Sequence, residues 1–143
     1  MYISKRHQLT DQETIYSLVE SHPLATWVCQ ATRGLVVNHI PFLLDRQRGE
    51  FGTLIGHVSR ANPVWRELDG VAASVAIFQG PQAYISPNAY PGKTEHGKVV
   101  PTWNYIAVHA WGQAEVFDEP ERLLQLVSRL SALHEAERPQ PWA

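Results

Sequence analysis

The chain has 143 residues, a formal net charge of −2 and 44% hydrophobic residues. This length suits one domain with its own core, and the hydrophobic content excludes a disordered chain. A near-neutral charge gives no excess of cations to neutralise a phosphate backbone, so sequence-independent binding to nucleic acid is not expected. We therefore treat residues 1–143 as a single domain.

Cysteine content and hydropathy indicate the compartment. The single cysteine, Cys29, lies in an apolar run and permits no intrachain disulfide, as expected in a reducing compartment. We expect a buried structural thiol, since no neighbouring cation in the sequence would lower its pKa. The sequence contains no run of about 18 apolar residues and no apolar N-terminal run, so neither a membrane span nor a secretion signal is expected. The pattern predicts a cytoplasmic protein.

The first element predicted is a helix. Thr10 and Glu13 have the spacing of a capping box, and apolar residues then recur at helical spacing. This predicts a helix over residues 11–21, ended by Pro23.

A β-hairpin is predicted next. Residues 24–31 and 35–44 are apolar and β-prone on either side of a Thr-Arg-Gly turn. Asn38 and His39 interrupt the second strand on opposite faces, where they either form a cross-strand hydrogen bond or contact a bound anion. The charged residues 45–50 predict a solvated turn.

A third strand over residues 51–58 leads into a short helix that opens at residues 59–63. Backbone N–H groups and the positive end of the helix dipole would converge at this strand end, beside His57, Ser59 and Arg60. The arrangement predicts a phosphate site. In the alternative, Ser59 only caps the helix and His57 only lies at the mouth of a barrel.

Two more strands and a charged loop follow. Residues 71–78 predict a buried strand, and a turn at residues 79–81 leads to a short strand over residues 83–86. The loop that comes next carries more charge than a connection requires, in Lys93, Glu95, His96 and Lys98. These side chains are predicted to grip a ligand or a partner, and a solvated loop is the alternative.

The segment after Pro101 alternates between two faces. One face carries Ile106, Val108, Ala110, Ala114 and Val116, and the other carries Trp103, Tyr105, His109, Trp111 and Phe117. This predicts a strand of a small closed barrel, with small residues inside and the aromatic face left for a ligand or a second subunit. Because a strand of this length would reach about 50 Å, we expect it to bend or bulge at Gly112.

The C-terminal part predicts an amphipathic helix over residues 119–135 that covers the barrel, with Asp118 as its N-cap and Pro120 in its first turn. The histidine spacing matches no zinc motif, and the sequence has no nucleophile elbow, P-loop or dinucleotide fingerprint. We therefore predict no metal site and no catalytic side chain.

Three motifs carry a family resemblance. They are Gly-His-Val-Ser-Arg-Ala-Asn-Pro at residues 56–63, Phe-Gln-Gly-Pro at 78–81 and His-Gly-Lys-Val-Val-Pro-Thr-Trp-Asn-Tyr at 96–105. With similarity from residues 1–3 to 141–143, the chain resembles the PaiB family of FMN-binding negative transcriptional regulators. That family belongs to the flavin-binding split-barrel group. The resemblance implies a mainly β fold with flanking helices, a split β-barrel, and a homodimer with FMN at the subunit interface.

The resemblance also implies a cofactor site. It places the FMN phosphate near the end of the third strand. Lys98, Thr102 and Trp103 are favoured as further contacts because they lie at the mouth of the long strand. Trp103 would stack on the isoalloxazine ring or fill an interface. The predicted cofactor-binding residues are Asn38, His39, His57, Ser59, Arg60, Lys98, Thr102 and Trp103.

Three functions follow from these observations. The leading one is an FMN-binding PaiB-like transcriptional regulator, and the others are a flavin-dependent oxidoreductase and a haem-binding protein on the same barrel. In an oxidoreductase the flavin would carry the redox step. PaiB-like proteins continue past the motif that ends at residue 143, so we expect either a truncated form or a sequence from which the remaining part was lost. DNA binding belongs to the full-length family, and the near-neutral charge without a helix-turn-helix argues against it here.

Overall fold

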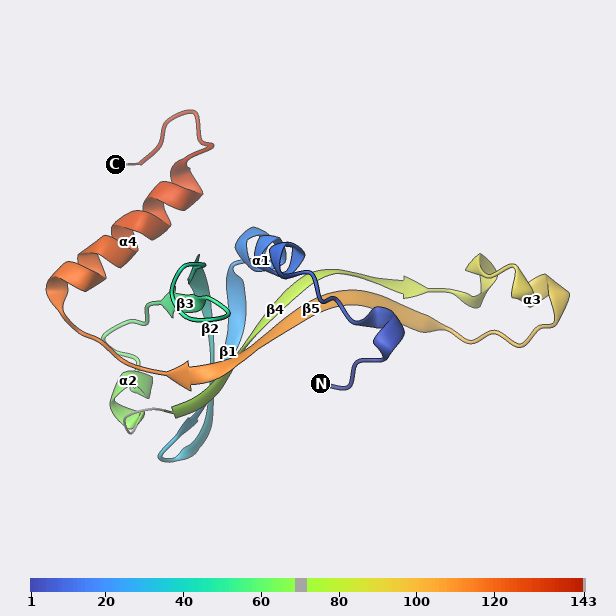
Figure 1. Ribbon diagram of the computed structural model, residues 1–143, viewed down its shortest axis with the longest axis horizontal. Helices are drawn as coiled ribbons and strands as arrows, with labels where there is room; N and C mark the ends of the chain where they lie inside the picture. Colours follow the sequence, from blue (N-terminus) through green and yellow to red (C-terminus); the bar gives the residue numbers. More distant parts are fainter. Residues whose placement is uncertain (69–71, 143) are drawn as a thin grey trace.

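The computed structural model describes residues 1–68 and 72–142 and is built on one antiparallel sheet with flanking helices (Figure 1). The strand order is β3-β2-β1-β4-β5. The strands are β1 (Leu24–Ala31), β2 (Gly34–Asp45), β3 (Thr53–Gly56), β4 (Ala72–Ile85) and β5 (Thr102–Ala114). The expected mainly β fold is confirmed. The expectation of a closed barrel is wrong, because β3 and β5 lie at the two ends of the order and do not pair.

The longer helices are α1 (Gln12–Ser21) and α4 (Pro120–Glu135), whereas α2 (Val64–Glu67) and α3 (Gly92–Glu95) are single turns. Short 3₁₀ turns occur at Lys5–His7 and Pro87–Ala89.

The cap of α1 differs from the prediction. Asp11, rather than Thr10, is the N-cap, and its carboxylate accepts a hydrogen bond of 2.8 Å from the Thr14 backbone N–H. Hydrogen bonds from the hydroxyl and N–H of Thr14 lower the pKa of Asp11. The cap therefore stabilises the helix fully at pH values above the ordinary carboxyl pKa. This stabilisation is lost as the pH falls through the lowered pKa of Asp11. At α4 the N-cap is likewise one residue later than predicted, at Glu119.

The predicted break between residues 78 and 83 is wrong. β4 is one strand that pairs with β5 from Ala72↔Ala114 to Ile85↔Thr102, with a register shift between Gln79 and Gln82. The irregularity lies where Pro81 has no N–H to donate, and not at Gly112, which pairs in register with Ser74. Val71, the first residue of the predicted strand, lies outside the described residues.

The main core lies on one face of the sheet. Phe78, Ala76, Ala25 and Val19 are buried, and Val108 and Ala110 pack against them. The predicted inward face of the last strand is confirmed for these two β5 residues. Burying a side chain as large as Phe78 contributes roughly 1.5–3 kcal/mol.

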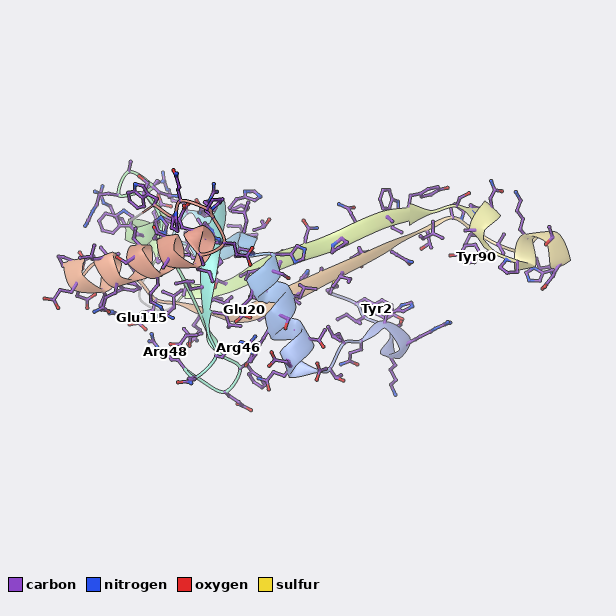
Figure 2. The ribbon with its side chains drawn as sticks, turned by 90° about the horizontal axis from the view of Figure 1, so that it is seen from above. Tyr2, Glu20, Arg46, Arg48, Tyr90 and Glu115 are labelled. Carbon is purple, nitrogen blue, oxygen red and sulfur yellow. The ribbon has the colours of Figure 1, made fainter. Side chains whose placement is uncertain are left out.

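Beyond the bulge, β4 and β5 leave the body as a long hairpin with α3 near its tip (Figure 1). We call residues 82–105 the arm. Its aromatic side chains are exposed: Tyr84 to 54%, Trp103 to 58% and Tyr105 to 60%. Tyr84 and Trp103 pair across the strands with ring centroids 5.9 Å apart in an edge-to-face arrangement. Tyr90 lies near the tip (Figure 2).

α4 covers only part of the sheet. Leu126 and Leu130 are buried against Leu43, with Ile55 and Phe117 partly buried beside them. Phe117 therefore belongs to this cluster and not to the exposed aromatic face predicted for it, because β5 ends at Ala114 and the alternation ends there.

The charged turn after β2 was predicted to be a solvated loop. The structure shows instead that Arg46 of this turn is held by ion pairs. The guanidinium of Arg46 donates two hydrogen bonds to the Glu20 carboxylate, at 2.8 and 2.6 Å, and two to Glu13, at 2.8 and 2.9 Å. It also lies 5.2 Å from the centroid of the Tyr16 ring. Figure 2 shows Arg46 and Glu20 side by side. Arg46 therefore fastens α1 to the end of β2.

We predict that Arg46→Ala lowers the melting temperature and reduces its dependence on salt, because the ion pairs that it removes are exposed and screened by salt. Thermal unfolding followed by circular dichroism at low and high salt measures both effects. The control is Arg6→Ala, which removes an exposed arginine in the 3₁₀ turn near the N-terminus. Equal melting temperatures for the two variants would contradict the prediction.

Cys29 is 1% exposed, as expected for a structural thiol. Burial raises its pKa, and the negative charge of Glu67 raises it further. We predict that a thiol reagent at pH 8 labels Cys29 slowly in the native protein and rapidly after denaturation, because the reactive thiolate is disfavoured and shielded. Mass spectrometry of timed samples checks this. Equal labelling rates in the two states would show that the thiol is accessible.

Candidate functional site

The segment at residues 57–63, which we call the β3–α2 turn, has an ordered local structure. The backbone N–H of Asn62 donates to the Ser59 carbonyl at 2.9 Å, and the Ser59 hydroxyl accepts from the Ala61 N–H at 3.2 Å. The Asn62 side-chain oxygen accepts from the Val64 N–H at 3.0 Å. These bonds close the chain into a tight turn directly after β3.

Asn38 ties this turn to the sheet. The Asn62 side-chain amide donates to the Asn38 side-chain oxygen at 2.7 Å. The nitrogen of the Asn38 amide is buried and has no acceptor in the part of the chain that the structure describes. A buried donor left unpaired costs about 1–3 kcal/mol, so this nitrogen is available to a ligand oxygen. One alternative predicted a cross-strand hydrogen bond for the Asn38 side chain. The structure shows a hydrogen bond to Asn62 of the turn instead.

Arg60 is the available cation of the turn. Its carbonyl accepts a hydrogen bond of 3.1 Å from the indole N–H of Trp65, and its guanidinium carbon lies 5.4 Å from the Trp65 ring centroid. Among residues 1–68 and 72–142 it has no carboxylate within ion-pair distance. His57, Ser59 and Arg60 are all exposed. They therefore offer an accessible group of donors and positive charge.

The helix contributes less than the sequence indicated. α2 has four residues, and its N-cap, Pro63, makes no side-chain cap. A single turn has little macrodipole, so anion binding here would depend on side chains and turn N–H groups. Trp65, which sequence reasoning treated only as part of the helix, holds Arg60 in place. The spacing of an arginine five residues before a tryptophan would not have revealed this contact.

His39 lies on the other face of the sheet, which we call the outer face. Residues opposite one another in antiparallel strands share a face, and side chains alternate along each strand. His39 pairs with Thr26, which pairs with Ile77, which pairs with His109. The exposed apolar residues of this outer face include Leu35 (73%), Val37 (55%), Trp111 (73%), Tyr105 (60%) and Trp103 (58%).

One chain does not bring all the predicted residues together. Thr102 and Trp103 lie on the arm and Lys98 lies in the loop at its tip, where the Lys98 N–H donates to the His96 ring nitrogen at 3.0 Å. Figure 1 shows the arm tip and α2 at opposite ends of the molecule. Any site that uses both groups needs a second chain.

A cleft of about 990 Å³ lies beside the β3–α2 turn. Its lining includes residues 53–58 of the β3 edge, residues 108–114 of the β5 edge, and side chains of α1 and α4. His57, Arg60 and Trp65 are on its wall, together with Arg122 and Arg129 of α4. The two α4 arginines were missed from the sequence, although their spacing of seven residues places them on one helix face.

The described ranges contain neither a cluster of metal ligands nor a membrane-spanning helix. Residues 1–68 and 72–142 contain no group of three or more histidine, cysteine, aspartate or glutamate side chains arranged for a metal ion. No helix within those ranges is long and apolar enough to cross a membrane.

The fold and the turn define a mainly β protein with an exposed turn that presents His57, Ser59 and Arg60. The sequence matches, over residues 1–143, the family described as "Putative FMN-binding domain". The chain belongs to this family, and FMN is the cofactor that the family binds.

Relatives support this assignment. The chain is 31% identical over 141 residues to "Protease synthase and sporulation protein PAI 2" of Bacillus subtilis. The aligned residues cover 99% of this chain and 65% of the relative. The chain is also 35% identical over 109 residues to an uncharacterized protein of Saccharomyces cerevisiae, covering 75% of this chain and 64% of that one. An uncharacterized protein of Aspergillus fumigatus is 32% identical over 146 residues, with 73% and 56% covered. The chain thus spans less than two thirds of the length of these relatives.

The hydrogen-bond donors of the residues at this turn suit the phosphate group of FMN. The phosphate of FMN needs several donors and positive charge, which Arg60, Ser59, His57 and the unpaired Asn38 amide can supply.

We predict that Asn62→Ala lowers the free energy of unfolding by about 1–2 kcal/mol, because it removes both the cap on Val64 and the bond to Asn38. Urea unfolding followed by tryptophan fluorescence measures the change. Asn104→Ala, at an exposed position on the arm, is the matched control and should change stability little. The prediction fails if the two variants are equally stable.

Proposed function

We propose that this chain is an FMN-binding regulatory domain of the PaiB type, in which the β3–α2 turn holds the flavin phosphate. The single observation that supports this placement is Arg60, which packs on Trp65 and is left without a carboxylate partner in the described chain. The name of the Bacillus subtilis relative supports a regulatory role.

The phosphate chemistry suits this turn. A phosphate monoester near neutral pH carries about −1.5 to −2 charges, and it is bound best by several charge-assisted donors. Arg60 supplies a fork of N–H groups, Ser59 supplies a hydroxyl, and His57 supplies a ring N–H. Asn38 adds a donor from the sheet behind the turn. When bound, FMN supplies reversible electron-transfer chemistry, and the domain orients it.

A second copy of the chain completes the site in this proposal. The exposed apolar residues of the outer face continue along β5 into the arm, because Trp103, Tyr105 and Trp111 share one face of an unbroken strand. A monomer would leave this surface in water. Docking two outer faces brings the arm of one chain toward the body of the other, so Lys98, Thr102 and Trp103 contact the flavin from the partner.

We predict that Arg60→Ala weakens FMN binding by roughly 10- to 100-fold, since a hydrogen bond to a charged group is worth about 1.5–3 kcal/mol. Titration of the protein with FMN, followed by flavin fluorescence, measures the affinity. Arg6→Ala is the matched control and should bind like the parent. Arg46 is unsuitable as a control, because it holds α1. Equal FMN affinities for Arg60→Ala and Arg6→Ala would show that the FMN phosphate does not bind at this turn.

The shared site has a separate test by subunit mixing. Arg60→Ala and Lys98→Ala should each bind FMN weakly as homodimers. A mixed dimer of the two variants contains one composite site with both native residues, so FMN binding at parental affinity should return to a fraction of the sites. If both residues act within one chain, mixing restores nothing.

The dimer itself is tested by mass. We expect light scattering to give twice the chain mass at micromolar concentration, and Val37→Glu to give a monomer, because it buries a charge in the docked outer face. Leu124→Glu on α4, at a position 70% exposed, is the control and should remain dimeric. A monomeric parent protein would refute the shared site.

A further inference from the structure

The side chain of Trp65 holds Arg60 at two points. The indole N–H donates to the Arg60 carbonyl oxygen at 3.1 Å, and the Arg60 guanidinium carbon lies 5.4 Å from the centroid of the indole ring. The first contact fixes the backbone of Arg60, and the second restrains the far end of its side chain. An exposed arginine without such contacts samples many rotamers, and it loses that freedom when it binds an anion. The contacts with Trp65 therefore remove part of this entropy loss before a ligand binds.

Trp65 is itself part of a fixed element. Its neighbour in α2, Val64, is 1% exposed. The Thr32 backbone N–H donates to the Glu67 carbonyl oxygen at 3.1 Å, and the Arg33 guanidinium pairs with the Glu67 carboxylate. These contacts join α2 to the turn between β1 and β2. The indole ring is thus attached to the sheet through α2, as a side chain that orients another one needs to be.

Contact with the indole ring leaves the Arg60 donors available. A cation–π contact uses the charge of a guanidinium and does not consume its N–H groups, which can still bind a phosphate as a fork. Arg60 is exposed, and both Arg60 and Trp65 line the cleft beside the β3–α2 turn. No carboxylate of residues 1–68 and 72–142 forms an ion pair with Arg60. The guanidinium is therefore both held in place and open to an anion.

We propose that Trp65 is a positioning residue that gives this domain its selectivity for FMN over riboflavin. The inference rests on the phosphate placement proposed above. Riboflavin has the same ring and ribityl chain as FMN but lacks the phosphate, so only FMN gains from an arginine that is already in place. Trp65 acts through Arg60 and does not itself contact the flavin.

Three substitutions separate this role from a purely structural one. Trp65→Leu removes the aromatic face and the indole N–H but keeps an apolar side chain on α2. Trp65→Phe keeps an aromatic face and has no N–H donor. Arg66→Ala is the matched control, because the Arg66 guanidinium carbon lies 4.6 Å from the centroid of the same ring, whereas Arg66 does not line the cleft.

The affinities of each protein for FMN and for riboflavin are measured by flavin fluorescence. We expect Trp65→Leu to weaken FMN binding about five- to tenfold, since the ring contact and the hydrogen bond are both lost. Trp65→Phe should weaken FMN binding only about twofold, because an aromatic face remains. Arg66→Ala should bind FMN within about twofold of the parent. Riboflavin affinity should be the same in all of these proteins.

A double variant tests whether Trp65 acts through Arg60. If it does, Arg60→Ala combined with Trp65→Leu should bind FMN no more weakly than Arg60→Ala alone, because the side chain that Trp65 holds is already absent. Independent contacts would instead multiply the two single losses. If Trp65→Leu does not fold, Trp65→Met takes its place in both experiments, since its longer flexible side chain fills more of the space of the indole.

Several results would overturn the inference while Arg60→Ala still binds FMN weakly, so that the phosphate placement stands. One is FMN binding by Trp65→Leu at parental affinity. Another is an equal loss of FMN and riboflavin affinity in Trp65→Leu, which would indicate direct contact with the flavin ring or a disturbed fold. A third is a double variant weaker than Arg60→Ala by the full factor of Trp65→Leu.

The control and the placement have their own outcomes. A loss of FMN affinity in Arg66→Ala as large as that in Trp65→Leu would also overturn the inference, because any positive charge at the ring would then suffice. Equal FMN affinities for Arg60→Ala and Arg6→Ala would instead show that the phosphate placement itself has failed.

Discussion

The antiparallel pairing of β4 with β5 is the interaction on which the rest of the structure depends. It continues from Ala72↔Ala114 in the body to Ile85↔Thr102 in the arm, across the bulge at Gly80 and Pro81. Within the body it places Phe78 and Val108 in the core. Beyond the bulge the same ladder continues into the arm, where the aromatic residues Tyr84, Trp103 and Tyr105 are exposed. One continuous ladder thus supplies both the core and the surface that we assign to a second chain.

The two faces of the sheet have different roles. The core side carries Phe42, Leu44 and Leu54 and opens into the cleft between the free edges. The outer face carries Leu35, Val37 and Trp111 and is exposed. The β3–α2 turn stands between these two surfaces, because it follows the edge strand β3. A flavin phosphate held at this turn would therefore be close both to a partner chain and to the cleft.

Several local interactions were open to prediction from the sequence and others were not. The strand at Leu24–Ala31 was predicted with its observed bounds, because its boundaries are marked by a proline before it and a glycine turn after it. The inward side of β5 was predicted at Val108 and Ala110, because a strand alternates with period two. The role of Arg46 was not predictable, since its carboxylate partners lie 26 and 33 residues away in the chain. The bond between Asn38 and Asn62 joins residues 24 apart and was missed for the same reason.

The sequence by itself determined the family, the cofactor and the kinds of elements. These depend on local signals, namely motif residues in order, the period of apolar positions, and turn residues such as Pro23 and Gly34. Only the tertiary structure decided that the sheet stays open, that β4 is one bulged strand, and that Lys98 and Trp103 lie far from Arg60 within one chain. The reason is physical: strand pairing and the distance between sites depend on contacts between residues far apart in sequence, and a local pattern specifies a strand without specifying its partner.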